Sequence, residues 1–271
     1  MFSMSCRRKD PLPSLILAGA LALAANGAWA SPIAPGFNST TFPANDDGST
    51  GLITPGFNLD FFGNTYSQFY INNNGNITFD SSMTTYTPFG LTTDTATPII
   101  APFFADVDTS NGGSPVTYGS GSYGGRSAFG VNWVNVSGFG LTSSLRDNFQ
   151  LILVDRSDIG AGDFDIRFNY GSMQWDTGSA SGGKSAHVGY SNGSGDPGTF
   201  YELPGSGISG AFLDGGPDQL ISATNDNTPG QILFEVRGGA VTPPRTVPEP
   251  ATLALIGLGL AGLGWARRRR P

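Results

Sequence analysis

The segment from Asp106 to Gly113 carries residue types at a spacing that could hold a metal ion. Asp106, Asp108 and Asn111 supply oxygen ligands close together, and two glycines follow them. Oxygen ligands of this kind suit Ca²⁺. The segment lacks the later bidentate glutamate of an EF-hand, and Asp and Asn side chains also stabilise turns. Two interpretations therefore stay open: a Ca²⁺ site at these three residues, or turn chemistry.

Catalytic chemistry has weaker support. His187 is the only histidine and could belong to a Ser-His-Asp site. It stands in a predicted strand, however, and no nucleophile-elbow sequence lies nearby. Glycoside hydrolysis needs two placed carboxylates, and the middle of the chain holds only Glu202 and Glu235 beside its aspartates. The spacing neither excludes an Asp pair nor points to one, so we expect a protein that is not an enzyme.

The elements that would position these residues are β-strands. Forty glycines and 19 prolines leave no long stretch with a helical period, whereas alternation of apolar and polar residues recurs between turn residues. Residues 163–170 predict a strand with one face in the core and one face in water. Residues 148–155 are apolar on both faces, which is typical of a central strand. The short linker between them predicts a hairpin.

A second hairpin is predicted at residues 68–79. A three-residue loop at 73–75, with Gly75 in the left-handed conformation, sets Ile71 opposite Ile77. Two packed antiparallel sheets would bury this many half-apolar strands. We therefore predict an all-β, antiparallel, sandwich-like single domain over residues 52–238, preceded by an N-terminal arm at 31–51. Trp133 and Trp175 are expected in the core, whereas Tyr118 and Tyr123, in the Gly- and Ser-rich segment 112–125, are expected to be exposed.

Both ends of the chain carry export signals. Residues 1–30 have basic residues, an apolar stretch and then Ala28-Trp29-Ala30, the pattern of a signal peptide cleaved after Ala30. The only cysteine, Cys6, leaves with that peptide, so the mature protein is expected to lack disulfides. At the other end, a Pro-rich spacer at 239–247 leads to the segment 248–271.

This C-terminal segment consists of Pro248-Glu249-Pro250, an apolar run and a cluster formed by Arg267, Arg268, Arg269 and Arg270. The run of about 16 residues predicts a short transmembrane helix with the arginines on the cytoplasmic side. Its marginal length favours transient membrane insertion followed by cleavage. The alternative is an ordinary single-pass tail anchor.

Between the two signals the chain is acidic. Residues 31–247 contain seven basic and 19 acidic side chains, a net charge of −12. Phosphate binding needs a basic face, so nucleic acid is excluded as a partner. Cations, neutral glycans and other proteins remain as partner classes.

Two resemblances to known families rest on particular residues. The tail, with its Pro-Glu-Pro, apolar helix and arginine cluster in that order, resembles the PEP-CTERM sorting signal of Gram-negative bacteria. The domain resembles the extracellular nidogen-like (NIDO) domain in six phrases, which are YINNNGNITF at 70–79, IIAPFFADVDT at 99–109, NFQLIL at 148–153, FNYGSMQW at 168–175, VGY at 188–190 and LPGS at 203–206.

These resemblances imply a function outside the cell. The tail implies recognition by an exosortase-type transpeptidase and delivery to the cell surface or extracellular matrix. The domain implies a role in cell-matrix adhesion or biofilm matrix assembly, with no known catalytic chemistry and with extracellular polysaccharide or matrix proteins as partners. The alternative is a calcium-assisted carbohydrate-binding module of the exopolysaccharide matrix.

Overall fold

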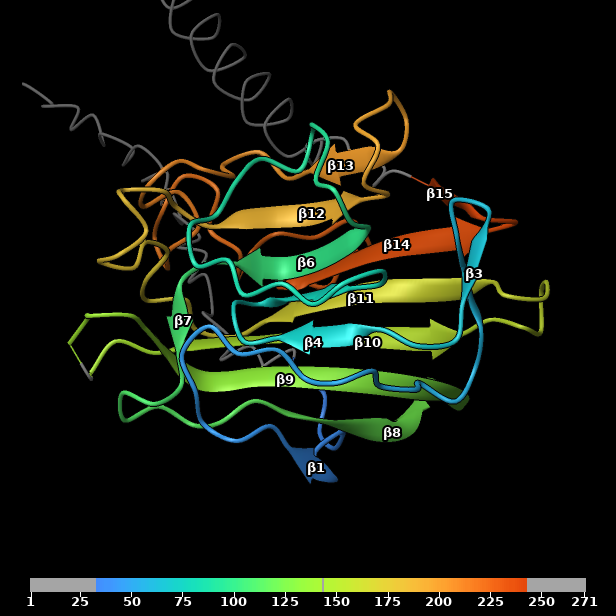
Figure 1. Cartoon of the computed structure of the whole chain (residues 1–271), viewed down its shortest axis with the longest axis horizontal. Helices are drawn as coiled ribbons and strands as arrows, with labels where there is room; N and C mark the ends of the chain where they lie inside the picture. Colours follow the sequence, from blue (N-terminus) through green and yellow to red (C-terminus); the bar gives the residue numbers. More distant parts are fainter. Residues whose placement is uncertain (1–32, 143, 243–271) are drawn as a thin grey trace, which may run out of the picture. The chain divides into compact units, whose positions relative to one another are not determined.

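The computed structural model of this chain describes residues 33–142 and 144–242, and every regular element in this part is a β-strand (Figure 1). An eight-stranded sheet has the order β1-β8-β9-β10-β11-β14-β15, with β7 also paired to β9. Its strands are β1 (Thr40–Thr41), β7 (Val107–Asp108), β8 (Thr117–Tyr123), β9 (Arg126–Gly138), β10 (Asp147–Asp155), β11 (Phe164–Tyr170), β14 (Gln231–Arg237) and β15 (Ala240–Thr242).

A five-stranded sheet has the order β13-β12-β6-β5-β4. Its strands are β4 (Tyr70–Asn72), β5 (Asn76–Thr78), β6 (Ile99–Phe104), β12 (His187–Ser191) and β13 (Phe200–Glu202). A separate hairpin is formed by β2 (Leu59–Phe61) and β3 (Asn64–Tyr66). All the pairs that these strands form are antiparallel.

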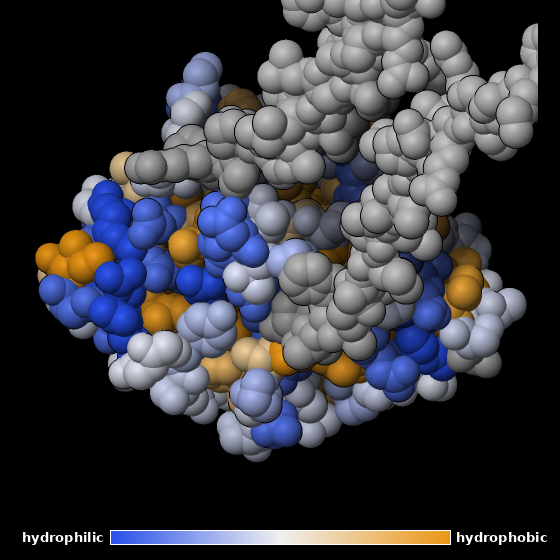
Figure 2. Space-filling view, turned by 180° about the vertical axis from the view of Figure 1, so that it is seen from behind, coloured by the Kyte–Doolittle hydropathy of each residue, from blue (hydrophilic) through white to orange (hydrophobic). Residues whose placement is uncertain are grey.

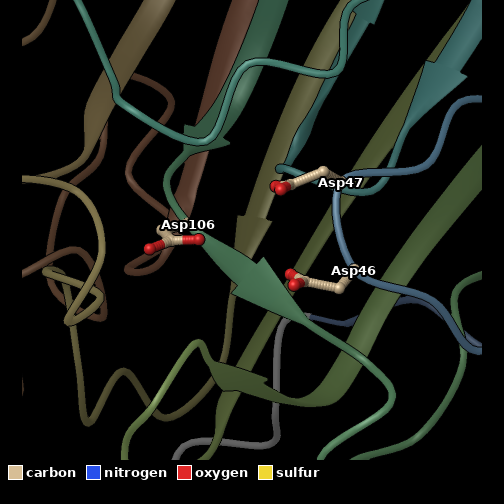
Figure 3. Close-up of side chains that lie close together, drawn as sticks. All are labelled: Asp46, Asp47 and Asp106. Atoms are coloured by element: carbon tan, nitrogen blue, oxygen red, sulfur yellow. The ribbon is translucent and has the colours of Figure 1, made fainter.

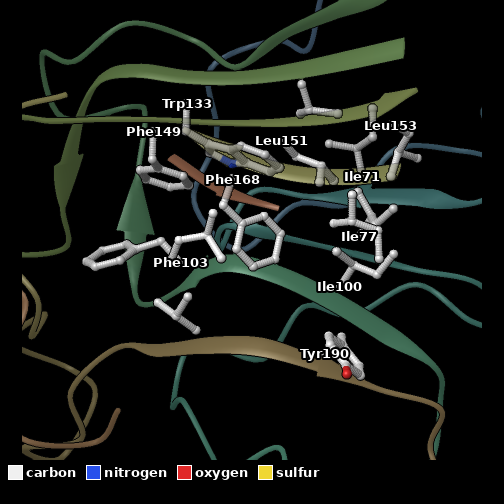
Figure 4. Close-up of a cluster of buried hydrophobic side chains, with 14 of the residues drawn as sticks. Ile71, Ile77, Ile100, Phe103, Trp133, Phe149, Leu151, Leu153, Phe168 and Tyr190 are labelled. Carbon is white, nitrogen blue, oxygen red and sulfur yellow. The ribbon is translucent and has the colours of Figure 1, made fainter. Parts of the chain in front are cut away.

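The two sheets enclose one large apolar core (Figure 4). The five-stranded sheet contributes Ile71, Ile77, Ile100, Phe103 and Tyr190, and the eight-stranded sheet contributes Trp133, Phe149, Leu151, Leu153 and Phe168. Burial of such apolar area is the main driving force for folding. The predicted all-β, sandwich-like arrangement of antiparallel sheets is therefore confirmed, as is the core position of both predicted tryptophans, which are 0% and 3% exposed.

Both predicted hairpins are present. In the first, β10 pairs with β11, and Leu151 lies opposite Phe168. In the second, Ile71 lies opposite Ile77, and Gly75 has a φ of 74°. The register and the left-handed glycine agree with the predicted three-residue loop.

The prediction that one side of the strand at 163–170 faces water is wrong. Asp165 and Asn169 on that side are 6% and 0% exposed. Arg156 and Arg237 form ion pairs with the Asp165 carboxylate. Asn169 Nδ2 donates to Gln150 Oε1, 2.7 Å away. This face is therefore a second, polar interior, because buried polar groups need partners such as these.

The segment before β1 provides the cover over that second interior. Asn132 donates through Nδ2 to the carbonyls of Gly36 and Phe37, 3.2 and 2.9 Å away, and Gln150 exchanges hydrogen bonds of 3.0 and 2.9 Å with the Ala34 backbone. The Phe37 ring is 5% exposed and packs with Ala128, Ile152 and Val154 in a smaller apolar cluster. Residues 34–37 of the predicted N-terminal arm thus lie on the outer face of the eight-stranded sheet.

Glycines make room for that arm. A Cβ atom on Gly130 of β9 would lie 2.4 Å from Phe37 Cγ, and one on Gly121 of β8 would lie 2.8 Å from Phe37 Cε1. Such separations are far below van der Waals contact. Tyr118 and Tyr123, which were expected to be exposed, are half-buried and lie in the seven-residue strand β8. Of the two glycines in β8, Gly121 leaves room for Phe37 and Gly119 leaves room for Ser39, whose Oγ would lie 2.2 Å from an added Cβ atom.

Figure 2 shows the molecule from behind, where separate apolar areas lie among hydrophilic residues on the coloured part of the surface. Within the described ranges, no helix has the length and apolar character that a membrane crossing requires. Several predicted features lie outside those ranges: the signal peptide with Ala28 and Ala30, the part of the spacer beyond Thr242, Pro248-Glu249-Pro250, and the segment that ends in Arg267 to Arg270.

Candidate functional site

Three carboxylates meet at one end of the sandwich. Asp46, Asp47 and Asp106 each offer a ligand oxygen, and these oxygens lie within 4.8 Å of one another (Figure 3). Asp106 directly precedes β7, whereas the other two belong to the loop that follows β1. Asp46 is exposed, Asp47 is half-buried and Asp106 is 1% exposed. We call this group the acidic cluster.

The Asn-rich hairpin loop between β4 and β5 holds the cluster together. Asn74 accepts from the Val107 N–H through Oδ1 and donates to Asp47 Oδ1 through Nδ2, both at 2.8 Å. Asn73 Nδ2 donates to the Val107 carbonyl. An antiparallel bridge also joins Asp46 to Asp108. Two buried carboxamides therefore fix the chain on both sides of the acidic cluster.

The electrostatics of the cluster disfavour full ionisation. Burial raises the pKa of Asp106 to about 7, and the negative charges of Asp47, Asp46 and Asp108 add to this, opposed by a hydrogen bond from the Ala180 backbone. Burial also raises the pKa of Asp46 to about 6, together with Asp47 and Asp108. Every charged group that shifts these two pKa values is another carboxylate. A cation placed there would relieve the repulsion.

The donor set is made of oxygen alone, which suits a hard cation such as Ca²⁺ and not a transition metal. Of the residues predicted from sequence, only Asp106 belongs to the acidic cluster. Asp108 Oδ1 accepts from the Ser110 N–H and hydroxyl, at 2.8 and 2.6 Å, as in an Asx turn. Asn111 Nδ2 donates to the Leu141 carbonyl at 3.4 Å. A Ca²⁺ site at Asp106, Asp108 and Asn111 remains a prediction.

Sequence reasoning missed Asp46 and Asp47. The adjacent acidic pair was visible in the sequence, but nothing local places it beside Asp106. The contact depends on the arm pairing with β8 and with the chain at 108–109, where the Thr109 N–H donates to the Asn45 carbonyl at 3.0 Å.

His187 has a structural environment. Its Nδ1 lies 2.5 Å from Glu202 Oε1, which also accepts from the Leu91 N–H at 3.1 Å. The Cε1–Nε2 edge of the ring faces Gly207, where a Cβ atom would lie 3.0 Å from Cε1 and 3.2 Å from Nε2. The pair joins β12, β13 and two loops.

A cavity of about 300 Å³ opens beside β13 and β14. Tyr201, Leu203, Phe212 and Ile232 supply apolar walls, and Asp218 stands among the polar lining residues. A concave site with aromatic walls and a few polar groups is typical of small-ligand binding. The acidic cluster shares no residue with this cavity.

Comparisons with known proteins agree with the two motifs. The family model described as NIDO related matches residues 22–227, and the PEP-CTERM protein-sorting motif matches residues 246–270. Alpha-tectorin of Gallus gallus is 30% identical over 251 residues, which cover 81% of this chain and 11% of that protein. Alpha-tectorin of Mus musculus is 30% identical over 239 residues, covering 76% and 10%.

Nidogen of Drosophila melanogaster is 29% identical over 209 residues, covering 66% of this chain and 14% of nidogen. The chain thus matches only about a tenth of the length of the tectorins. No solved structure matches it significantly. The chain belongs to the NIDO-related family and carries a PEP-CTERM protein-sorting motif.

Proposed function

We propose that this protein is a non-enzymatic component of the bacterial cell surface or extracellular matrix. In this proposal it is exported by its N-terminal signal, held briefly in the inner membrane by its C-terminal helix, and released or attached by an exosortase-type transpeptidase. The NIDO-related domain then contributes to cell-matrix adhesion or biofilm assembly through surface contacts with polysaccharide or matrix proteins.

The observation that carries the proposal is the presence of both motifs on one chain. The sorting motif indicates a destination outside the cell, and the NIDO-related domain is suited to a role there. The fold supports this reading, because a sandwich with one large apolar core can be stable without disulfides. His187 bonded to Glu202 supports a structural role for the one histidine.

The test uses a strain that lacks the protein and is complemented with full-length variants. Replacing Pro248, Glu249 and Pro250 with alanine should leave the protein in the membrane fraction and reduce biofilm mass and cell attachment toward the deletion level. Alanine at Pro243 and Pro244, in the neighbouring spacer, is the matched control. This variant should restore biofilm mass and cell attachment. Matrix delivery and attachment that survive the Pro-Glu-Pro change would refute the proposal.

A second candidate function is carbohydrate binding, and the cavity beside Tyr201 favours it. An aromatic wall next to the Asp218 carboxylate offers the apolar and polar contacts that a sugar ring needs. A glycan array probed with the full-length protein, with and without chelator, tests it. Binding lost in Tyr201→Ala would support this function, and binding lost only with chelator would place calcium in it. The absence of binding to any glycan would refute it.

A further inference from the structure

The cavity beside β13 and β14 is lined by both sheets and by the chain that connects these two strands. Tyr201 comes from β13 of the five-stranded sheet, and Ile232 comes from β14 of the eight-stranded sheet. Phe212 and Leu220 come from the connecting chain, and they are each 1% exposed, whereas Ile232 is 2% exposed. The cavity therefore has an apolar floor that can receive the apolar face of a ligand.

The folded chain around this cavity fixes its shape. The Asp218 N–H donates to the Ala211 carbonyl at 3.0 Å, and the Leu220 N–H donates to the Phe212 carbonyl at 3.3 Å. A Cβ atom on Gly205 would lie 2.8 Å from Asp218 Cβ, so the turn after β13 packs directly against Asp218. A site that is formed before the ligand arrives avoids the cost of ordering it on binding.

Hydrogen-bonding groups of the lining residues are free to contact a ligand. Asp218 is exposed, and no hydrogen bond or ion pair within the described residues uses its carboxylate. The same holds for the Tyr201 hydroxyl, which keeps its proton because burial raises the pKa of Tyr201. Gln219 accepts through Oε1 from the Gly215 N–H at 2.9 Å, which leaves its Nε2 donors free. The cavity therefore offers both acceptors and donors.

The charge and the size of the cavity narrow the class of ligand. Asp218 is the only charged residue among the described residues that line it, so an anionic ligand would meet a carboxylate and no compensating cation. The volume of about 300 Å³ lies at the lower end of the range for ligand sites, about 300–1,000 Å³. This volume suits a single sugar ring better than a peptide or a lipid chain.

We propose that this cavity binds a neutral hexopyranose unit and discriminates against the corresponding uronic acid. The proposal rests on carbohydrate binding, the second candidate function, and adds to it the kind of sugar. The Tyr201 ring packs against Tyr190 and Phe234, with ring centroids 6.1 and 5.7 Å away, and the surface that it leaves to the cavity contacts the C–H face of the sugar. Asp218 accepts from neighbouring hydroxyls of the sugar, whereas a carboxylate on the same ring is repelled.

Isothermal titration at low ionic strength, with full-length protein in mild detergent, tests the proposal. The probes are the methyl glycosides of glucose, galactose and mannose and those of the matching uronic acids, which differ from them only by the carboxylate at C6. At least one neutral glycoside should bind with a Kd in the millimolar range, as expected for so small a ligand. Its uronic acid should bind at least about fivefold more weakly, which is the effect of two unit charges about 4 Å apart in water.

Asp218→Asn is the decisive variant, because Asp218 is exposed and its substitution should leave the fold intact. It should weaken binding of the neutral glycoside by about threefold or more, since hydrogen bonds to a charged acceptor are the stronger ones. It should also reduce the preference for the neutral glycoside over the uronic acid by at least about fivefold. Asp196→Asn, at an exposed aspartate outside the lining residues, makes the same change in net charge and should keep the wild-type affinity and preference.

Three results would overturn the proposal: no saturable binding of a neutral glycoside up to about 50 mM, a uronic acid that binds as tightly as its neutral counterpart, or wild-type affinity and preference in Asp218→Asn. Equal binding of a neutral glycoside and its uronic acid that is lost in Tyr201→Ala would leave carbohydrate binding in place and remove only the charge preference. Matrix delivery and cell attachment are scored separately, in the strain that carries the Pro-Glu-Pro change, so they can succeed or fail independently of this cavity.

Discussion

Replacing Gly75 with alanine should destabilise the protein far more than alanine at glycines that have open space around them. Gly75 lies at the turn between β4 and β5, with a φ of 74°. An added Cβ atom would lie 1.8 Å from the Phe103 carbonyl oxygen of β6 and 3.2 Å from the Phe149 ring. Since these neighbours are backbone and core, the hairpin must move away from β6.

The cost has two parts. A left-handed conformation costs a residue with a Cβ atom about 1–2 kcal/mol. Displacement of the turn also breaks the bonds from the Phe103 N–H to the Gly75 carbonyl, at 3.2 Å, and from the Ala105 N–H to the Asn74 carbonyl, at 3.3 Å. Each is worth about 0.5–1.5 kcal/mol. Gly75→Ala should therefore lower the free energy of unfolding by roughly 2–5 kcal/mol.

Two other glycines separate the parts of that cost. Gly124, in the turn between β8 and β9, has a φ of 58° but nothing within 4 Å of an added Cβ, so Gly124→Ala should cost only the conformational part, about 1–2 kcal/mol. Gly90 has open space and no positive φ, so Gly90→Ala should change stability by less than about 0.5 kcal/mol.

Urea unfolding followed by tryptophan fluorescence measures all three variants. With a slope of about 3 kcal/mol per molar urea, a loss of about 3 kcal/mol lowers the midpoint by about 1 M. The reasoning is refuted if Gly75→Ala costs no more than Gly124→Ala, because the close packing of the hairpin turn against β6 would then not exist.

Three further predictions follow from buried groups. Burial raises the pKa of Asp147 well above its usual value, so the folded state keeps a proton that the unfolded state loses above about pH 4. The contribution of Asp147 to the free energy of unfolding should therefore fall as pH rises from there. Asp147→Asn has no such proton to lose, so in urea unfolding its stability relative to the wild type should rise between about pH 5 and 8. Phe37→Ala empties the recess under the arm and should cost about 3–5 kcal/mol, with faster proteolysis of the arm; unchanged proteolysis would contradict the arm's position. Trp133→Phe removes the Nε1–H donor that lies 3.0 Å from the Asn73 carbonyl and should cost about 1–3 kcal/mol in the same unfolding assay.

Local patterns were enough to predict the strands of the core. The alternation at 163–170 and the apolar run at 148–155 correspond to β11 and β10, in the register that their hydrophobic residues require. The turn at Gly75 could be predicted from the sequence, because few other residues adopt its left-handed conformation at little cost.

The outer layer could not be predicted in the same way. Asn169 and Asp165 alternate with apolar residues as on a wet face, and sequence alternation does not distinguish water from a buried network of amides and ion pairs. The glycines of β8 look like loop residues until Phe37 is placed against Gly121. Asp46 meets Asp106 only through the arm, a contact between distant residues for which the local sequence has no signal.

Mass spectrometry of the protein recovered from the cell surface and the surrounding matrix tests the central claim most directly. The proposal predicts a chain that begins near Ser31, ends near Pro248-Glu249-Pro250 and lacks Arg267 to Arg270, with any attached group visible as added mass. If the surface protein keeps its arginine cluster, the tail is a permanent membrane anchor and not a sorting signal that is cut off. Full-length protein found folded in the cytosol would contradict the account as a whole.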